Sequence, residues 1–194
     1  MSKLFIFDMG EVLILNVRTL PQIADELGLD YKLLHSDWLY YDMPLMDGFM
    51  SPEDYYRHLE LAFDIAPIKE DLFHKYFHPQ VNTHMVENVK RLKDAGHRVV
   101  VGSNTFKPHW ERKIINYPWL DLFDNLYASH LMHISKPQPA FWLNIMRYEG
   151  FSSSDTVFID DRLENISSAS KLGIKTFQYL GDNVAIDEFF SCYL

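Results

Sequence analysis

Three stretches of this chain repeat one pattern, an amphipathic helix that ends at a glycine and is followed by a short apolar, β-branched run. The glycines that end these helices are Gly96, Gly150 and Gly173. Glycine just beyond a helix adopts the left-handed conformation without steric cost and turns the chain back. A helix, a glycine and a buried strand in this order are typical of parallel sheets whose two faces are covered by helices.

The pattern predicts an α/β fold with a doubly wound, Rossmann-like parallel sheet of about five strands. A continuous apolar run near the N-terminus supplies one further strand, and a weaker run precedes the second of the three helices. The expected strands are residues 4–7, 97–101, 126–128, 156–159 and 175–177.

Residues 16–80 follow a different pattern, with amphipathic helices expected over 20–27, 31–41 and 51–63 and no continuous apolar strand. Ser51 and Pro52 form a good helix start, a hydroxyl cap followed by proline in the first turn. We therefore expect a core domain of residues 1–15 and 81–194 and a small all-helical cap domain of residues 16–80, inserted after the first strand. The cap is interpreted as a lid; the alternative is a set of extra helices without a gating role.

Charge and cysteine content limit the partners. The formal net charge of −9 argues against a nucleic-acid or anionic-membrane partner, because no basic surplus can neutralise phosphates. A small phosphorylated metabolite stays compatible, since one lysine or a cation can reverse the field inside a cleft. Cys192 has no other cysteine to pair with, and no apolar run approaches the roughly 18 residues of a membrane span. We expect a cytoplasmic protein of undetermined oligomeric state.

Polar residues follow four of the expected strands. They are Asp8 after the first strand, Ser103 and Asn104 after the second, Lys136 in the loop after the third, and Asp160 and Asp161 after the fourth. Ligands of open parallel sheets bind beyond the carboxyl ends of the strands, so these residues should meet at one rim. Three carboxylates at one place repel each other, and a divalent cation relieves that repulsion. Oxygen ligands without histidine or cysteine favour Mg²⁺.

Four short motifs resemble those of the haloacid dehalogenase-like hydrolase superfamily, in the family's order and over nearly the whole chain. They are residues 5–10, 101–104, 136–139 and 158–161. Within the superfamily the chain looks most like the subgroup of α-glucose-1-phosphatase and the phosphatase domain of soluble epoxide hydrolase. The resemblance implies a Mg²⁺-dependent phosphatase acting on a small phosphate monoester through an aspartyl-phosphate intermediate, with a sugar phosphate as the expected substrate.

The resemblance also implies roles for individual residues. Asp8 would attack phosphorus, while Ser103 and the Asn104 backbone amide would hold the phosphoryl oxygens and Lys136 would neutralise the charge between them. The expected Mg²⁺ ligands are Asp8, the Gly10 carbonyl, Asp160 and Asp161. Of the last two, Asp161 is the preferred direct ligand, and Asp160 would bind directly or through water.

Gly10 departs from the family pattern. Most phosphatases of the superfamily carry a second aspartate at this position as general acid and base, a function worth about 10²–10⁴-fold in rate. The substrate could have an acidic leaving group such as an anomeric hydroxyl, or a water or substrate hydroxyl could replace the acid. Alternatively, the protein is a non-catalytic or regulatory phosphate-binding protein. Glu11 is a candidate substitute acid, with a solvent-facing residue as the alternative.

Other reactions and residues fit less well. The paired aspartates argue against carbon–halogen hydrolysis, which needs no metal, and Gly10 argues against a phosphomutase. The remaining conspicuous side chains are expected to have structural roles: His130 and His133 as surface or core residues, Tyr40, Tyr41, Asp42 and Asp47 in cap packing rather than substrate contact, and Trp110 and Trp142 between helices and sheet.

Overall fold

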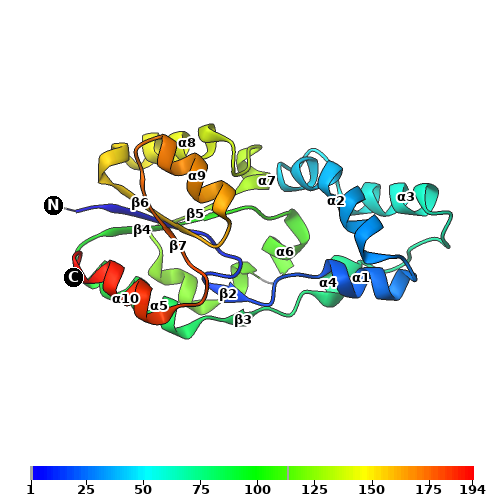
Figure 1. Cartoon of the computed structure of the whole chain (residues 1–194), viewed down its shortest axis with the longest axis horizontal. Helices are drawn as coiled ribbons and strands as arrows, with labels where there is room; N and C mark the ends of the chain where they lie inside the picture. The colour runs from blue at the N-terminus through cyan, green and yellow to red at the C-terminus, as the bar shows by residue number, and fades with distance from the viewer. Residues whose placement is uncertain (1, 113) are drawn as a thin grey trace.

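The computed structural model describes residues 2–112 and 114–194 and shows two units joined end to end (Figure 1). The larger unit is an α/β sandwich, and the smaller one consists of the helices between residues 20 and 76. Both chain termini lie at the end of the larger unit that is remote from the smaller one (Figure 1).

The larger unit contains a five-stranded sheet in the order β5-β4-β1-β6-β7, and every neighbouring pair is parallel. The strands are β1 (Leu4–Phe7), β4 (Arg98–Ser103), β5 (Asn125–Ala128), β6 (Thr156–Asp160) and β7 (Lys175–Gln178). The predicted fold class and strand number are therefore confirmed. The second strand was predicted over residues 97–101. The observed strand β4 begins one residue later and extends to Ser103, because Gly102 and Ser103 still pair with β5.

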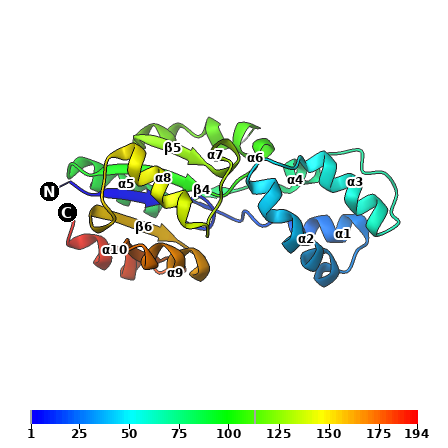
Figure 2. The same cartoon turned by 90° about the horizontal axis from the view of Figure 1, so that it is seen from above.

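Helices cover both faces of this sheet (Figures 1 and 2). On one face lie α8 (Pro139–Glu149) and α9 (Leu163–Lys171), and on the other lie α5 (Thr83–Asp94) and α10 (Asn183–Ser191). Side chains of β1 alternate between the two layers, as the two-residue period of a strand requires. Leu4 and Ile6 pack with the α8 and α9 side, whereas Phe5 and Phe7 pack with the α5 and α10 side.

Trp110 and Trp142 are buried in these two layers, 3% and 0% exposed, which confirms their predicted packing role. The described part of this unit also contains short 3₁₀ helices. They are η1 (Ile114–Asn116), η2 (Pro118–Leu122) and η3 (Ser153–Asp155).

The smaller unit, which we call the cap, has its own apolar core. Its helices are α1 (Leu20–Leu27), α2 (Tyr31–Met46), α3 (Pro52–Ala62) and α4 (Leu72–Tyr76). Buried residues from all four helices, including Ile23, Leu34, Tyr55 and Phe73, form one cluster. The structure bears out the helix start at Ser51, whose hydroxyl accepts from the Asp54 amide in a capping box.

Two cap helices differ from the sequence-based expectation. Helix α2 continues to Met46 although Pro44 lies inside it. Proline removes one backbone hydrogen bond, and this loss falls within the last turn, where the helix is ending. Helix α4 was not predicted, because five residues are too few to show a helical period.

A two-stranded antiparallel ribbon joins the units, formed by β2 (Ile14–Leu15) and β3 (Gln80–Val81). We propose this ribbon as the boundary between core and cap, at the residue numbers expected from the sequence. The cap also contacts the core through α6 (Lys107–Arg112) and α7 (Ser129–Met132). Among the described residues, 2–112 and 114–194, no helix combines the length and apolar character needed to cross a lipid bilayer.

Candidate active site

Three carboxylates meet at the carboxyl ends of β1 and β6. Phe7 pairs in register with Ile159, so Asp8 and Asp160 are the next residues on two adjacent parallel strands. One carboxylate oxygen from each of Asp8, Asp160 and Asp161 lies within 4.8 Å of the other two. The convergence expected from the strand ends is therefore present.

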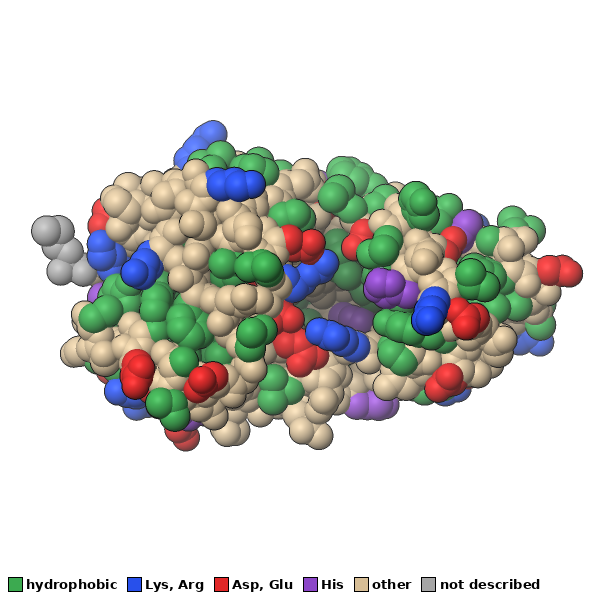
Figure 3. Space-filling view, viewed as in Figure 1, with side chains coloured by type: hydrophobic (Ala, Val, Ile, Leu, Met, Phe, Trp, Pro, Cys, Tyr) green, Lys and Arg blue, Asp and Glu red, His purple; other side chains and the backbone are tan. Residues whose placement is uncertain are grey.

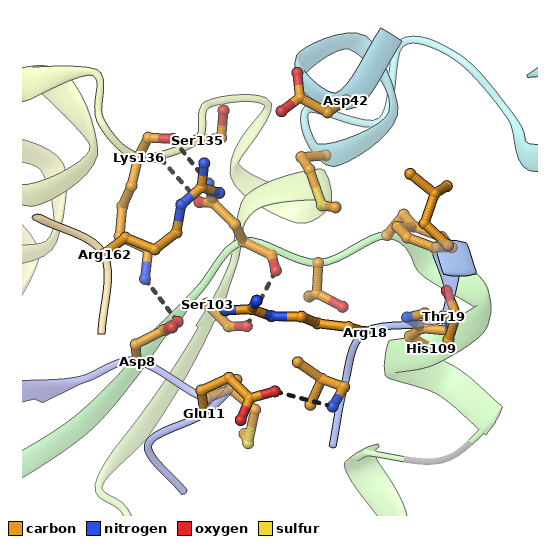
Figure 4. Close-up of a pocket in the computed structure, with 18 of the residues that line it drawn as sticks. Asp8, Glu11, Arg18, Thr19, Asp42, Ser103, His109, Ser135, Lys136 and Arg162 are labelled. Atoms are coloured by element: carbon orange, nitrogen blue, oxygen red, sulfur yellow. Dashed lines mark hydrogen bonds and ion pairs between the residues drawn. The ribbon is translucent and has the colours of Figure 1, made fainter. Parts of the chain in front are cut away.

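Lys136 lies between two of these carboxylates. Its Nζ is 2.6 Å from Oδ1 of Asp8 (Figure 4) and 2.8 Å from Oδ2 of Asp160, and its side chain is fully buried. Burial pulls the pKa of Lys136 down, but the attraction of Asp160 and Asp8 outweighs it and raises the pKa above its ordinary value. The lysine is therefore held as an ammonium ion.

The electrostatic balance at Asp8 is different. Burial raises the pKa of the Asp8 carboxyl to about 7, and repulsion from Asp160 and Asp161 adds to this, while the Lys136 ammonium opposes it. Burial and the neighbouring Asp160 also raise the pKa of Asp161. One ammonium thus does not compensate three carboxylates, and a further positive charge would be favourable here.

The donor set fits a hard divalent cation. All three groups offer carboxylate oxygens, and no histidine or cysteine belongs to this cluster of the described residues. Asp160 is fully buried and is held by Lys136, by the Arg162 amide at 2.8 Å and by the Asn165 side-chain amide at 3.0 and 3.1 Å. Asp161, by contrast, lines the adjoining cavity and is partly exposed.

Asn104 positions the loop that carries Lys136. Its side-chain amide donates to the Lys136 carbonyl at 2.8 Å, and its side-chain oxygen accepts from the Lys136 amide at 2.9 Å. This reciprocal pair joins the end of β4 to a loop 32 residues further along the chain. Ser103, also at the end of β4, is 2% exposed and lines the same cavity as Asp8 and Lys136.

Gly10 lines the cavity as well, and Val17 occupies the space beside it. A Cβ placed on Gly10 would lie 3.2 Å from Cγ2 of Val17, which is closer than most contacts of real Cβ atoms. Glu11 has a left-handed backbone with φ of 55°, and its carboxylate accepts a hydrogen bond from the Val17 amide at 3.2 Å. Figure 4 shows Glu11 on the same side of the cavity as Asp8.

The cavity has a volume of about 470 Å³ and lies between the rim of the sheet and the cap (Figure 3). This is within the range of about 300–1,000 Å³ that is usual for small-molecule sites. Its walls come from the strand ends on one side and from α1, α2 and α4 on the other. Arg18 extends its guanidinium into the cavity towards Ser103 (Figure 4).

His130 in α7 and His133, the residue that follows this helix, have structural contacts. His130 is 7% exposed, its Nδ1 lies 3.0 Å from the Thr105 carbonyl oxygen, and burial lowers its pKa. His133 Nδ1 lies 3.0 Å from the Asp47 carbonyl oxygen.

The polar cap residues Tyr40, Tyr41, Asp42 and Asp47 lie in different environments. Tyr40 is 80% exposed and lies outside the cavity lining, whereas the Tyr41 hydroxyl is 3.3 Å from Nδ1 of His58. Asp47 is buried and its side chain accepts from Gln138 at 3.3 Å. Asp42 alone of these four lines the cavity, and burial raises its pKa.

Sequence reasoning did not identify Asn165, Arg18 or Val17 as parts of this site. The position of Asn165, five residues after Asp160, is a detectable signal, because it places the amide in the first turn of α9 next to the strand end. The proximity of Val17 to Gly10 depends on the path of the linker into the cap, for which the sequence carries no signal.

The family model of haloacid dehalogenase-like hydrolases matches residues 2–173. The chain belongs to this family. The predicted superfamily is thereby confirmed, and the closer placement beside α-glucose-1-phosphatase stays a prediction.

Two characterised relatives are similar over most of their length. The sesquiterpene phosphatase astK of Aspergillus oryzae is 28% identical over 182 residues, which cover 89% of this chain and 87% of that protein. The D-ribitol-5-phosphate phosphatase of Bacteroides thetaiotaomicron is 25% identical over 191 residues, with 92% of each chain covered.

A solved structure has the same fold. It is a haloacid dehalogenase-family enzyme from Bacteroides thetaiotaomicron in complex with magnesium and inorganic phosphate, and it superimposes with a TM-score of 0.75 at 21% identity. The match covers 94% of this chain and 96% of that one.

Proposed function

We propose that this protein is a Mg²⁺-dependent phosphatase that hydrolyses a small phosphate monoester through an aspartyl-phosphate intermediate on Asp8. The observation that carries the proposal is the cluster of Asp8, Asp160 and Asp161 around the buried Lys136 ammonium, at the edge of a cavity large enough for a metabolite. Two relatives named as phosphatases and a neighbour crystallised with magnesium and phosphate support it.

In the proposed reaction an Asp8 carboxylate oxygen attacks phosphorus, and the bond from phosphorus to the leaving oxygen breaks. The Ser103 hydroxyl and the Asn104 amide hold the phosphoryl oxygens, and the Lys136 ammonium offsets their charge. The leaving alkoxide takes a proton from water, because Gly10 has no side chain to supply one. Water then attacks phosphorus of the aspartyl-phosphate, which releases inorganic phosphate and restores Asp8.

Mg²⁺ would be held by Asp8, Asp161 and the Gly10 carbonyl, with Asp160 direct or through water, and would supply positive charge to the phosphoryl group. Asp161 is the better candidate for direct ligation, because the Asp160 carboxylate already accepts from Lys136, Asn165 and Arg162. Asn165 and Asn104 would be positioning residues that hold Asp160 and Lys136 in place.

Release of p-nitrophenol from p-nitrophenyl phosphate tests the proposal. We expect release in Mg²⁺ and its loss in EDTA, and we expect Asp8→Asn to lower kcat by at least about 10³-fold, because it removes the nucleophile. Asp94→Asn, at an exposed position where the carboxylate pairs with Lys90, is the matched control and should keep the wild-type rate. An Asp8→Asn protein as active as the wild type would refute the nucleophile.

A non-catalytic phosphate-binding protein is the second candidate. The observation that favours it is the position of Val17 beside Gly10. Gly10 has no side chain that could act as the general acid, and Val17 occupies the space that such a side chain would need. In that case the wild-type protein would bind inorganic phosphate in Mg²⁺, measured by calorimetry, and would release no product from any phosphate monoester.

A further inference from the structure

Helix α2 carries apolar side chains on two of its faces. One face, with Leu34 and Leu45, is fully buried in the core of the cap. The second face carries Tyr31, Leu39 and Met43, which are 45%, 57% and 45% exposed and all line the cavity. These three residues are spaced by eight and four positions, so they lie in one row along the helix.

Part of the opposite wall of the cavity is also apolar. Val17 comes from the linker into α1 and Leu20 is the first residue of α1, while Phe77 directly follows α4 and Phe106 directly precedes α6. The polar groups that α2 contributes to the lining are His35, Asp42, the Tyr31 hydroxyl and the Trp38 indole N–H, and Arg18, Thr19 and His109 lie elsewhere in the lining. A polyol or sugar would need a hydrogen-bond partner for each buried hydroxyl, and the side chains of Leu39 and Met43 offer none.

The apolar walls begin at the phosphoryl site itself. The same cavity contains Asp8, Ser103 and Lys136, so a bound molecule can have its phosphate at the rim and its organic part against α2. Val17, which lies beside Gly10, is an apolar lining residue next to the reacting centre. Isolated exposed apolar side chains are ordinary, but three on one row of a helix, with only His35 between them, that all face a pocket mark a place that a ligand covers.

We infer that the substrate of the proposed phosphatase is an amphipathic monophosphate, with an apolar chain or ring system that packs on Tyr31, Leu39 and Met43. This inference rests on the proposed function and selects a substrate class that differs from a sugar phosphate. Burial of each methylene of such a chain contributes about fourfold to kcat/KM, because its transfer from water to an apolar surface is favourable by about 0.8 kcal/mol.

The test is a series of n-alkyl phosphates from ethyl to octyl, together with D-ribitol 5-phosphate, assayed for released phosphate in Mg²⁺. We expect kcat/KM to rise with chain length by about fourfold per methylene, so that octyl phosphate exceeds butyl phosphate by on the order of 10²-fold. D-ribitol 5-phosphate should be hydrolysed more slowly than octyl phosphate.

Two variants of α2 form a matched pair. Leu39→Ser changes a cavity-lining leucine that is 57% exposed, whereas Leu33→Ser changes a leucine that is 61% exposed and lies outside the cavity lining. We expect Leu39→Ser to reduce the dependence of kcat/KM on chain length to about half of its wild-type slope. The Leu33→Ser protein should keep the full dependence.

The outcomes separate this inference from the proposed function. If p-nitrophenyl phosphate is hydrolysed but kcat/KM is independent of chain length, or D-ribitol 5-phosphate is preferred, the apolar substrate is refuted and the phosphatase stands. Leu39→Ser could instead lower the melting temperature and leave the dependence of kcat/KM on chain length unchanged. Tyr31, Leu39 and Met43 would then stabilise the packing of the cap on the core, and the inference would also be refuted. Absence of any phosphate release refutes the phosphatase itself.

Discussion

At the scale of single residues, the site is held together by opposite charges that a bound cation would rebalance. The Lys136 ammonium contacts Asp8 and Asp160, yet burial and the neighbouring carboxylates still raise the pKa of Asp8 to about 7. Removing one partner of such a buried pair leaves an uncompensated charge, which costs about 3–5 kcal/mol. The arrangement is therefore costly for stability without a second cation and well suited to binding one.

Gly10 gives a prediction at the same scale. An aspartate at position 10 would supply the missing proton donor, but its Cβ would lie 3.2 Å from Val17 Cγ2. The double variant Gly10→Asp/Val17→Ala removes that clash. We expect it to hydrolyse ethyl phosphate about 10-fold to 100-fold faster than Val17→Ala alone, with a smaller gain for p-nitrophenyl phosphate, whose leaving group needs less protonation.

Steady-state rates for both substrates check this prediction, and Val17→Ala alone is the control for the larger cavity. An equal gain for both substrates would mean that the new carboxylate does not act as an acid. The single variant Gly10→Asp should gain less than the double variant, because Val17 has to move.

At the scale of elements, the sequence predicted the site best where a residue directly follows a strand, because the strand alone then fixes its position. Continuous apolar runs predicted all five strands, and parallel pairing then brought Asp8 and Asp160 together without any knowledge of the loops. The hydrogen bonds between the Asn104 side chain and the Lys136 backbone could not be predicted, and neither could the contact of Val17 with Gly10. Both depend on the path of loops in three dimensions.

Helix α2 shows a second limit. Its apolar residues occur on two faces, and a sequence period does not distinguish a face that packs on protein from one that lines a cavity. The predicted helix ended at Tyr41 because Pro44 and the weak period removed the signal for its last turn. Met43 and Met46, which line the cavity, lie in this missed part.

Glu149 connects α8 with β4 and β5 and gives a prediction of pH dependence. Its side chain is 2% exposed and accepts from Arg98, Tyr127 and Asn125. Burial alone would raise the pKa of Glu149, but the Arg98 guanidinium and the two other donors hold it below its ordinary value of 4.5. The folded state therefore favours the ionised carboxylate.

Because the folded-state pKa lies below the unfolded one, this stabilisation is complete above about pH 4.5 and is lost as the pH falls through the folded value. We expect Glu149→Gln to lower the free energy of unfolding by about 1–3 kcal/mol at pH 7, with the difference from wild type shrinking below pH 4.5. Urea unfolding at several pH values measures it. The exposed Glu188→Gln is the control, and a difference that is constant down to pH 3 would contradict the assignment.

At the scale of the whole molecule, the cap is attached to the core by more than its two linkers. Helix α4 packs on α6, where Phe106 belongs to the apolar cluster of the cap. At the other side the end of α2 lies on α7, where the Ser129 hydroxyl donates to the Met46 carbonyl oxygen. These two contacts hold Tyr31, Leu39 and Met43 of α2 opposite the phosphoryl site.

Ser129 therefore tests how the two units are coupled. It is fully buried, its hydroxyl lies 2.5 Å from the Met46 carbonyl oxygen, and it accepts from the Thr105 amide at 3.0 Å. Ser129→Ala leaves both backbone groups without this partner, which costs about 1–3 kcal/mol. Since Thr105 also lines the cavity, we expect faster hydrogen exchange of backbone amides at residues 46–50 and 105–106, a higher KM, and unchanged exchange in β1 and β6. The exposed Ser170→Ala should alter none of these quantities; unchanged exchange at residues 46–50 in Ser129→Ala would mean that the linkers alone position the cap.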